Sequence, residues 1–264
     1  MKENVKDVVK EKYAEIAEQN AGSCCAPGCC GPQILEISMI GDDYDKIEGH
    51  IDEADLGLGC GIPTEYADIK SGDTVLDLGS GAGNDAFIAS KLAGPSGYVI
   101  GVDMTSQMID RANINKEKFK FTNVEFRLGE IEALPVQDDS VNVILSNCVL
   151  NLVPDKIKAF SEIYRVLKPG GHFCISDVVI VGELPEGFKK SAELYAGCIS
   201  GAITRDEYIG IIKQVGFAEV QIPKEKRIVI PEELYERYLS GDEKEKLLNS
   251  GFGIFSVTVK ALKK

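Results

Sequence analysis

The segment VLDLGSGAGND, residues 75–85, carries the sharpest signal in this sequence. It starts as an apolar strand that ends in Asp77 and runs through Gly79, Gly81 and Gly83 into a helical pattern. Glycines in such a turn let the backbone approach a ligand closely at a helix N-terminus. The segment predicts a ligand-binding turn, and the alternative is a tight strand-to-helix turn that binds nothing.

A second acidic residue extends this signal. Asp103 ends the next apolar run, where a carboxylate can accept hydrogen bonds from ribose hydroxyls. The glycine spacing is G-x-G-x-G, whereas a dinucleotide site has G-x-G-x-x-G, and no G-K-[ST] follows to hold a triphosphate. The pair predicts an adenosine-containing ligand and disfavours NAD and ATP.

Apolar runs and amphipathic stretches alternate around this turn. Such alternation predicts an α/β fold in which helices cover both faces of a parallel sheet. The expected strands are 74–78, 98–103, 124–128, 141–146 and 172–180, and the expected helices lie near 84–93, 105–116 and 155–167.

The two ends of the chain add smaller elements. Residues 4–18 predict an amphipathic helix, which leads into a loop carrying four cysteines, and the acidic segment 33–59 stays unassigned. Further patterns predict helices near 186–197 and 204–215, strands at 218–222 and 227–230, a solvated helix over 231–248, and a last strand over 252–264 that could return to the sheet. We therefore expect three regions: an N-terminal helix and cysteine-rich arm (1–60), a ligand-binding core (61–182), and C-terminal substrate-site helices with closing strands (183–264).

Composition limits the class of protein. The chain has 264 residues, 44% of them hydrophobic, and a formal net charge of −13, which repels nucleic acid and anionic membranes. No run approaches the roughly 20 apolar residues of a membrane-spanning helix. We expect a soluble cytoplasmic protein without a coiled-coil seam, hence a monomer, whose eight cysteines are thiols rather than structural disulfides.

Four motifs in order resemble those of the class I S-adenosylmethionine methyltransferases, which have a Rossmann-like sheet. They are VLDLGSGAG (75–83), GVD ending at Asp103, GEIEALP (129–135) and RVLKPGG (165–171). The resemblance implies S-adenosylmethionine as cofactor. It assigns the cofactor's methionine part to the turn formed by Asp77, Gly79, Ser80, Gly81 and Gly83, and its ribose to Asp103. Its adenine would contact Met104, Glu130 and Ile131, and its sulfonium would lie beside Ser146 and Asn147 at the end of the fourth strand. Ordinary core packing is the alternative for Met104.

Three cysteines occur in contexts that suit an acceptor site. Cys60 lies in LGLGCGIP, Cys148 in SNCVLNL at the carboxyl end of the fourth strand, and Cys198 in AGCISGA. Ligands of open α/β sheets bind beyond the carboxyl ends of the strands, so we expect Cys148 beside the reactive methyl group. Converging thiols suit a soft, thiophilic acceptor. Cys174, inside the strand HFCISDVV, is interpreted as buried filler.

These cysteine contexts, together with GVDMT, SDVV and the methyltransferase motifs, resemble the arsenite S-adenosylmethionine methyltransferases. The resemblance implies that thiolates of Cys60, Cys148 and Cys198 hold trivalent arsenic, and that a thiol reductant such as thioredoxin or a small thiol restores the cysteines. A further cysteine of that family should correspond to one of Cys24, Cys25, Cys29 and Cys30. These four could deliver arsenic and form disulfides during turnover, or they could form a metal clip.

Two other functions stay open at this stage. One is methylation of another small acceptor, of the quinone or sterol type, with structural cysteines. The other is a non-catalytic, thiol-based protein that binds a metalloid, for which we would expect a damaged cofactor site. The intact VLDLGSGAG and Asp103 argue against the second.

Overall fold

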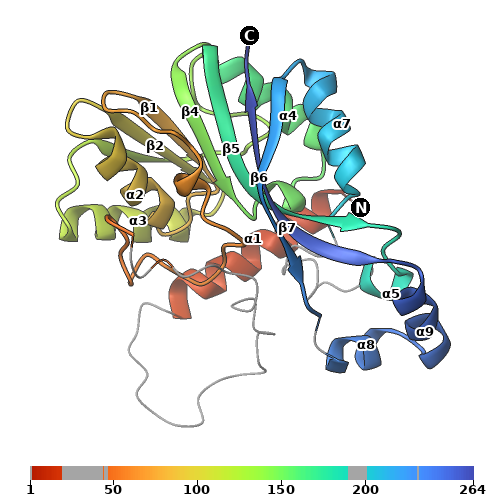
Figure 1. Ribbon diagram of the computed structural model, residues 1–264. Helices are drawn as coiled ribbons and strands as arrows, with labels where there is room; N and C mark the ends of the chain where they lie inside the picture. The colour runs from red at the N-terminus through yellow and green to blue at the C-terminus, as the bar shows by residue number, and fades with distance from the viewer. Residues whose placement is uncertain (1, 20–43, 45–46, 190–200, 231) are drawn as a thin grey trace.

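A computed structural model describes residues 2–19, 44, 47–189, 201–230 and 232–264 of the chain (Figure 1). The cysteines at positions 24, 25, 29, 30 and 198 lie outside these ranges, and so does most of the helix expected over 186–197. None of the described helices combines the length and apolar character needed to cross a membrane.

A seven-stranded sheet forms the centre of the molecule, in the order β3-β2-β1-β4-β5-β7-β6. The first five strands run parallel, β7 pairs antiparallel with β5, and β6 pairs antiparallel with β7. The strands are β1 (Thr74–Leu78), β2 (Tyr98–Asp103), β3 (Val124–Leu128), β4 (Val141–Asn147), β5 (Leu167–Val181), β6 (Ala218–Ile228) and β7 (Gly253–Leu262). The expected α/β sheet and the return of the final strand to it are confirmed.

Helices cover both faces of the sheet because successive strand residues point to opposite sides. Val75 and Val143 pack with Phe87 of α2 on one face, whereas Leu76 packs with Phe160 of α4 and its neighbours on the other. The helical elements are α1 (Lys2–Gln19), η2 (Pro63–Glu65), α2 (Asn84–Ala93), α3 (Ser106–Lys118), η3 (Leu150–Leu152), α4 (Lys156–Val166), α5 (Glu186–Lys189), α7 (Arg205–Val215), α8 (Glu232–Tyr238) and α9 (Gly241–Asn249).

Three boundaries differ from those expected. Strand β5 begins at Leu167 rather than at residue 172, because the backbone around Gly170 and Gly171 pairs with Lys263. The two strands expected over 218–230 form one edge strand, β6, whose register shifts around Gln221 and Lys224 accommodate Pro223. The charged helix expected over 231–248 is two helices, because a capping box at Ser240 and Glu243 starts α9.

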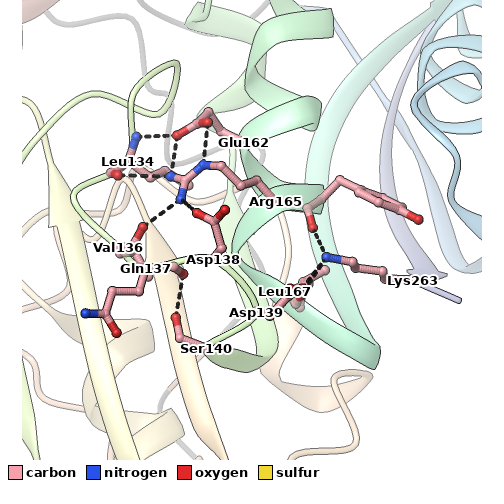
Figure 2. A network of polar contacts seen from close by, with 11 residues as sticks. Leu134, Val136, Gln137, Asp138, Asp139, Ser140, Glu162, Arg165, Leu167 and Lys263 are labelled. Carbon is pink, nitrogen blue, oxygen red and sulfur yellow. Dashed lines mark hydrogen bonds and ion pairs between the residues drawn. The ribbon is translucent and has the colours of Figure 1, made fainter.

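A polar network fixes the loop between β3 and β4 (Figure 2). The Arg165 guanidinium of α4 donates to Glu162, to Asp138 and to the carbonyl oxygens of Leu134 and Val136. Since this loop also carries residues 130–132, the network holds one wall of the cavity described next.

Candidate active site

A cavity of about 1150 Å³, counting its open mouth, lies at the carboxyl ends of β1, β2 and β4. Small-molecule sites typically measure about 300–1,000 Å³, and this volume exceeds that range because it includes open solvent at the mouth. Ten of the residues singled out from the sequence line it: Asp77, Gly79, Ser80, Gly81, Asp103, Met104, Glu130, Ile131, Asn147 and Cys148. The structure therefore brings three of the four methyltransferase-like motifs to the cavity. The fourth, RVLKPGG, lies next to the loop between β3 and β4 that forms one wall.

The glycine turn between β1 and α2 shapes the cavity floor. Gly79 has φ of +67°, and a side-chain carbon there would lie 2.5 Å from Val149, so glycine is required. Gly81 lines the cavity with open space around its Cα. Gly83 lies outside the lining, where it caps α2 against the rings of Phe87 and Phe126.

Asp103 joins the end of β2 to this turn. Its Oδ2 accepts a hydrogen bond from the Gly81 N–H at 3.0 Å, and its Oδ1 accepts one from the Thr105 N–H at 2.8 Å. Burial raises the pKa of the Asp103 carboxyl, and these backbone donors oppose that rise. Each oxygen keeps lone pairs for a ligand, so the carboxylate can serve both the turn and a hydroxyl in the cavity.

Two more carboxyls, the buried Asp77 and the partly buried Asp85, lie beside the same cavity. Burial and the neighbouring Asp85 and Asp103 raise the pKa of Asp77 well above its usual value, and burial raises the pKa of Asp85 to about 6. Among the described residues, neither Asp77 Oδ2 nor Ser80 Oγ has a hydrogen-bond partner. Orphaned polar atoms and clustered anionic groups of this kind suit a ligand with donors and a positive charge.

An amide at the end of β4 links the cavity to the Cys60 loop. Asn147 Oδ1 accepts from the Cys60 N–H at 2.9 Å, and Asn147 Nδ2 donates to the Gly61 carbonyl at 2.8 Å. The same Nδ2 lies 3.0 Å from Asp85 Oδ2 and 2.7 Å from the Tyr44 hydroxyl. Sequence reasoning missed Asp85 and Tyr44. Asp85 stood inside the glycine motif, whereas nothing near Tyr44 marked it.

Cys60 and Cys148 are both buried in one apolar cluster, with side-chain exposures of 0% and 3%. Cys148 follows β4 directly with φ of +60°, and its N–H donates to the Ser176 carbonyl at 2.8 Å. A non-glycine residue in this left-handed region costs free energy and is held by its surroundings. The Cys60 carbonyl accepts a hydrogen bond from Ser256 Oγ of β7.

The glycines on either side of Cys60 permit this approach. A side-chain carbon at Gly59 would lie 2.7 Å from Asn147 Nδ2, and one at Gly61 would lie 2.7 Å from Ser176 Oγ. Glycine at these two positions therefore lets the Cys60 loop approach Asn147 and Ser176 closely.

The remaining cysteines divide into two groups. Cys174 is fully buried inside β5, and burial raises the pKa of its thiol to about 12, which agrees with filler. Cys198, Cys24, Cys25, Cys29 and Cys30 lie outside the described residues. Within the described ranges, no three His, Cys, Asp or Glu side chains cluster as metal ligands would.

A buried polar pair lies behind the two thiols. The Tyr208 hydroxyl of α7 donates to Asp177 Oδ2 at 3.2 Å, and burial raises the pKa of Asp177 to about 7. Burial and Asp177 raise the pKa of Tyr208, and Cys60 and Cys148 are near enough to add to that rise.

Helix α1 lies over the mouth of the cavity, which the amphipathic pattern of residues 4–18 could not reveal. Its Lys6, Val9 and Tyr13 join the lining. Lys6 Nζ forms an ion pair with Glu130 at 2.8 Å and a second with Glu132. The contact with Lys6 lowers the pKa of Glu130, so this carboxylate is ionised and engaged by α1.

Comparison with known proteins supports one family. A protein-family model described as a methyltransferase domain matches residues 69–216 of the chain. Arsenite methyltransferase of Halobacterium salinarum is 46% identical over 85% of this chain, and that of Aquipseudomonas alcaligenes is 39% identical over 84%. The chain spans 60% and 64% of the lengths of these two relatives.

A solved structure gives the same indication. It is CrArsM, an arsenic (III) S-adenosylmethionine methyltransferase from Chlamydomonas reinhardtii, with 32% identity and a TM-score of 0.67. The match covers 89% of this chain and 75% of that one.

Proposed function

The chain belongs to the arsenite methyltransferase family within the methyltransferase-domain proteins, and from this premise we propose that it transfers methyl groups from S-adenosylmethionine to trivalent arsenic. The observation that carries the proposal is that Cys148 lines the same cavity as the carboxyls of Asp77, Asp85 and Asp103. A thiol for a soft acceptor thus lies beside a site suited to a cation.

The residues of the cavity fit this cofactor. S-adenosylmethionine supplies a positively charged sulfonium whose methyl group is open to attack. It also carries hydrogen-bond donors that could pair with Asp77 Oδ2 and Ser80 Oγ, which have no partner among the described residues. We assign its binding to the lining residues Asp77, Gly79, Ser80, Gly81, Asp103, Met104, Glu130, Ile131 and Asn147, with Gly83 shaping the turn. A cation in this cavity stabilises the ionised carboxylates, and they in turn stabilise it.

The thiols hold the acceptor in this proposal. Cys60 and Cys148, with Cys198 as the third ligand implied by the family, bind arsenic(III) as thiolates. Arsenic bound to three sulfurs is pyramidal and keeps a lone pair, which attacks the methyl carbon. The arsenic–carbon bond forms as the carbon–sulfur bond breaks, and the positive charge passes to arsenic, so no proton leaves and no histidine base is needed. Positioning the lone pair and the methyl group lowers the activation free energy by up to roughly 7–11 kcal/mol.

The proposal extends to the setting of the reaction. Cysteines that bind arsenic as thiolates require a reducing compartment, so we propose a cytoplasmic location and regeneration by a thiol reductant such as thioredoxin or a small thiol. We also propose that the protein is a monomer. A net charge of −13 argues against nucleic acid or an anionic membrane as partner. We assign cofactor binding and the arsenic ligand Cys148 to residues 61–182, and the other acceptor contacts to the segments on either side.

The test is methyl transfer from labelled S-adenosylmethionine to arsenite in excess thiol. We expect methylated arsenic from the parent and its loss in Cys60→Ser, Cys148→Ser and Cys198→Ser, with Cys174→Ser as the matched control that stays active. A parent that binds the cofactor but yields no arsenic product would contradict the proposal. The next acceptor to try would then be a quinone, because demethylmenaquinone methyltransferase of Lactococcus lactis is 35% identical over 53% of the chain.

A further inference from the structure

The Cys60 thiol is on a stretch of chain without regular secondary structure, yet its backbone is held from two sides. Asn147 accepts from the Cys60 N–H and donates to the Gly61 carbonyl, at 2.9 and 2.8 Å. Ser256 donates to the Cys60 carbonyl. A loop residue fixed at its N–H, at its carbonyl and at the next carbonyl has little freedom to move its side chain away.

The amide that holds Cys60 belongs to the residue immediately before Cys148. Asn147 ends β4, and Cys148 is fixed by its left-handed backbone and by its bond to the Ser176 carbonyl. Asn147 therefore links the backbone of one cysteine to that of the other through a single side chain. The hydrogen bond between Asn147 and the Cys60 N–H thus joins two segments that are 87 positions apart in the sequence.

The amide is itself fixed by its surroundings. Its Nδ2 lies within hydrogen-bond distance of Asp85 Oδ2 and the Tyr44 hydroxyl, and Tyr44 also donates to the Gly61 carbonyl at 2.9 Å. The amide packs against Gly59, where a side-chain carbon would lie only 2.7 Å from Nδ2.

We propose that Asn147 is a positioning residue that sets the Cys60 thiol at bridging distance from Cys148, so that both can bind one arsenic atom. This role rests on the proposed function and adds to the contact of Asn147 with the cofactor cavity. A preorganised pair of ligands avoids the entropic cost of ordering the loop when arsenic binds.

The experiment measures capture of phenylarsenite, an arsenical that takes two thiols. Peptide mapping by mass spectrometry identifies which cysteines are bridged, and titration gives the affinity. We expect Asn147→Ala to weaken bridging of Cys60 and Cys148 by at least about tenfold, the scale seen when an outer contact of a metal ligand is removed. Gly59→Ala should act in the same direction by displacing the amide.

Matched measurements separate positioning from general damage. Tyr44→Phe removes a hydroxyl from the network but keeps the bond between Asn147 and the Cys60 N–H, so bridging should fall much less. Alkylation of single thiols by iodoacetamide and the melting temperature should change little in Gly59→Ala, whereas bridging falls.

Two negative results have different meanings. A parent in which phenylarsenite bridges no two of Cys60, Cys148 and Cys198 overturns the proposed arsenic site. A parent that bridges another pair of these thiols, or in which Asn147→Ala and Gly59→Ala bridge Cys60 and Cys148 equally well, overturns only the positioning role.

Discussion

The carboxylate side of the cavity is built from neighbouring strands and the turns that follow them, whereas the thiol side joins segments that are far apart in the sequence. Asp77 and Asp103 end adjacent parallel strands, and backbone donors hold Asp103. Asn147 of β4 and Ser256 of β7 hold the Cys60 loop, which shares an apolar cluster with Cys148. The first side depends on a local motif, and the second depends on the tertiary fold being complete.

The largest expected effect separates the two sides. Cys148→Ser removes an arsenic ligand but keeps nearly the same shape, so methyl transfer to arsenite should fall at least about 100-fold, or about 2.7 kcal/mol. Cofactor affinity, measured by equilibrium dialysis, should stay within about threefold, because the carboxylate side is untouched. A similar loss of both would show that the two sides are not independent.

The converse substitution is Asp103→Asn. It removes the charge that two backbone N–H groups bind, contacts worth roughly 1.5–3 kcal/mol each, so cofactor affinity should fall about 10-fold to 100-fold. Phenylarsenite capture by Cys60 and Cys148 should be unchanged. An equal loss of arsenical capture would contradict the separation.

These two sides also differ in how far the sequence predicts them. Asp77, Gly79 and Asp103 were predictable because strand ends and glycine turns are encoded within a few residues. Tyr44 was not, since it lies in a segment without periodicity and acquires its role only by touching Asn147 and Asp85. The cover of α1 over the cavity was equally hidden, because an amphipathic face shows that a helix packs but not on what.

A pH titration should show a moderate effect confined to the carboxylate side. Burial raises the pKa of Asp85 to about 6. Below that pH, a cationic cofactor binds in its favoured form only if Asp85 first loses its proton, which weakens binding. Cofactor affinity should rise by up to about tenfold per pH unit as pH approaches 6 from below and level off above it. Calorimetric binding from pH 5 to 8 checks this, and Asp85→Asn should flatten the profile.

The same group has a stability consequence with the opposite sign. Folded Asp85 keeps its proton up to a pH of about 6, whereas in the unfolded chain it ionises near about 3.9. The folded state binds more protons between these values, so the contribution of Asp85 to the free energy of unfolding falls as pH rises through that window. Because the cofactor should bind more tightly above pH 6, the rise in melting temperature that it causes should be larger at pH 8 than at pH 5. Equal rises at both would contradict the assignment of Asp85 to the cofactor cavity.

The smallest effect concerns α1. Lys6→Ala removes two ion pairs, with Glu130 and Glu132, each worth about 0.2–1 kcal/mol, so the cofactor should dissociate about 2-fold to 30-fold faster. The difference should shrink in high salt because exposed charges are screened. Stopped-flow release of a fluorescent cofactor analogue measures it, and a loss above about 100-fold would mean that α1 does more than cover the cavity.

The most direct test of the central claim is arsenic K-edge X-ray absorption of the protein loaded with one equivalent of arsenite. If Cys60 and Cys148 hold the acceptor beside the cofactor cavity, the parent should show arsenic bound by three sulfurs at about 2.3 Å, by analogy with zinc thiolates. The double variant Cys60→Ser, Cys148→Ser should lose that set and gain oxygen neighbours. An unchanged three-sulfur spectrum in the double variant would place arsenic on other thiols and contradict the account.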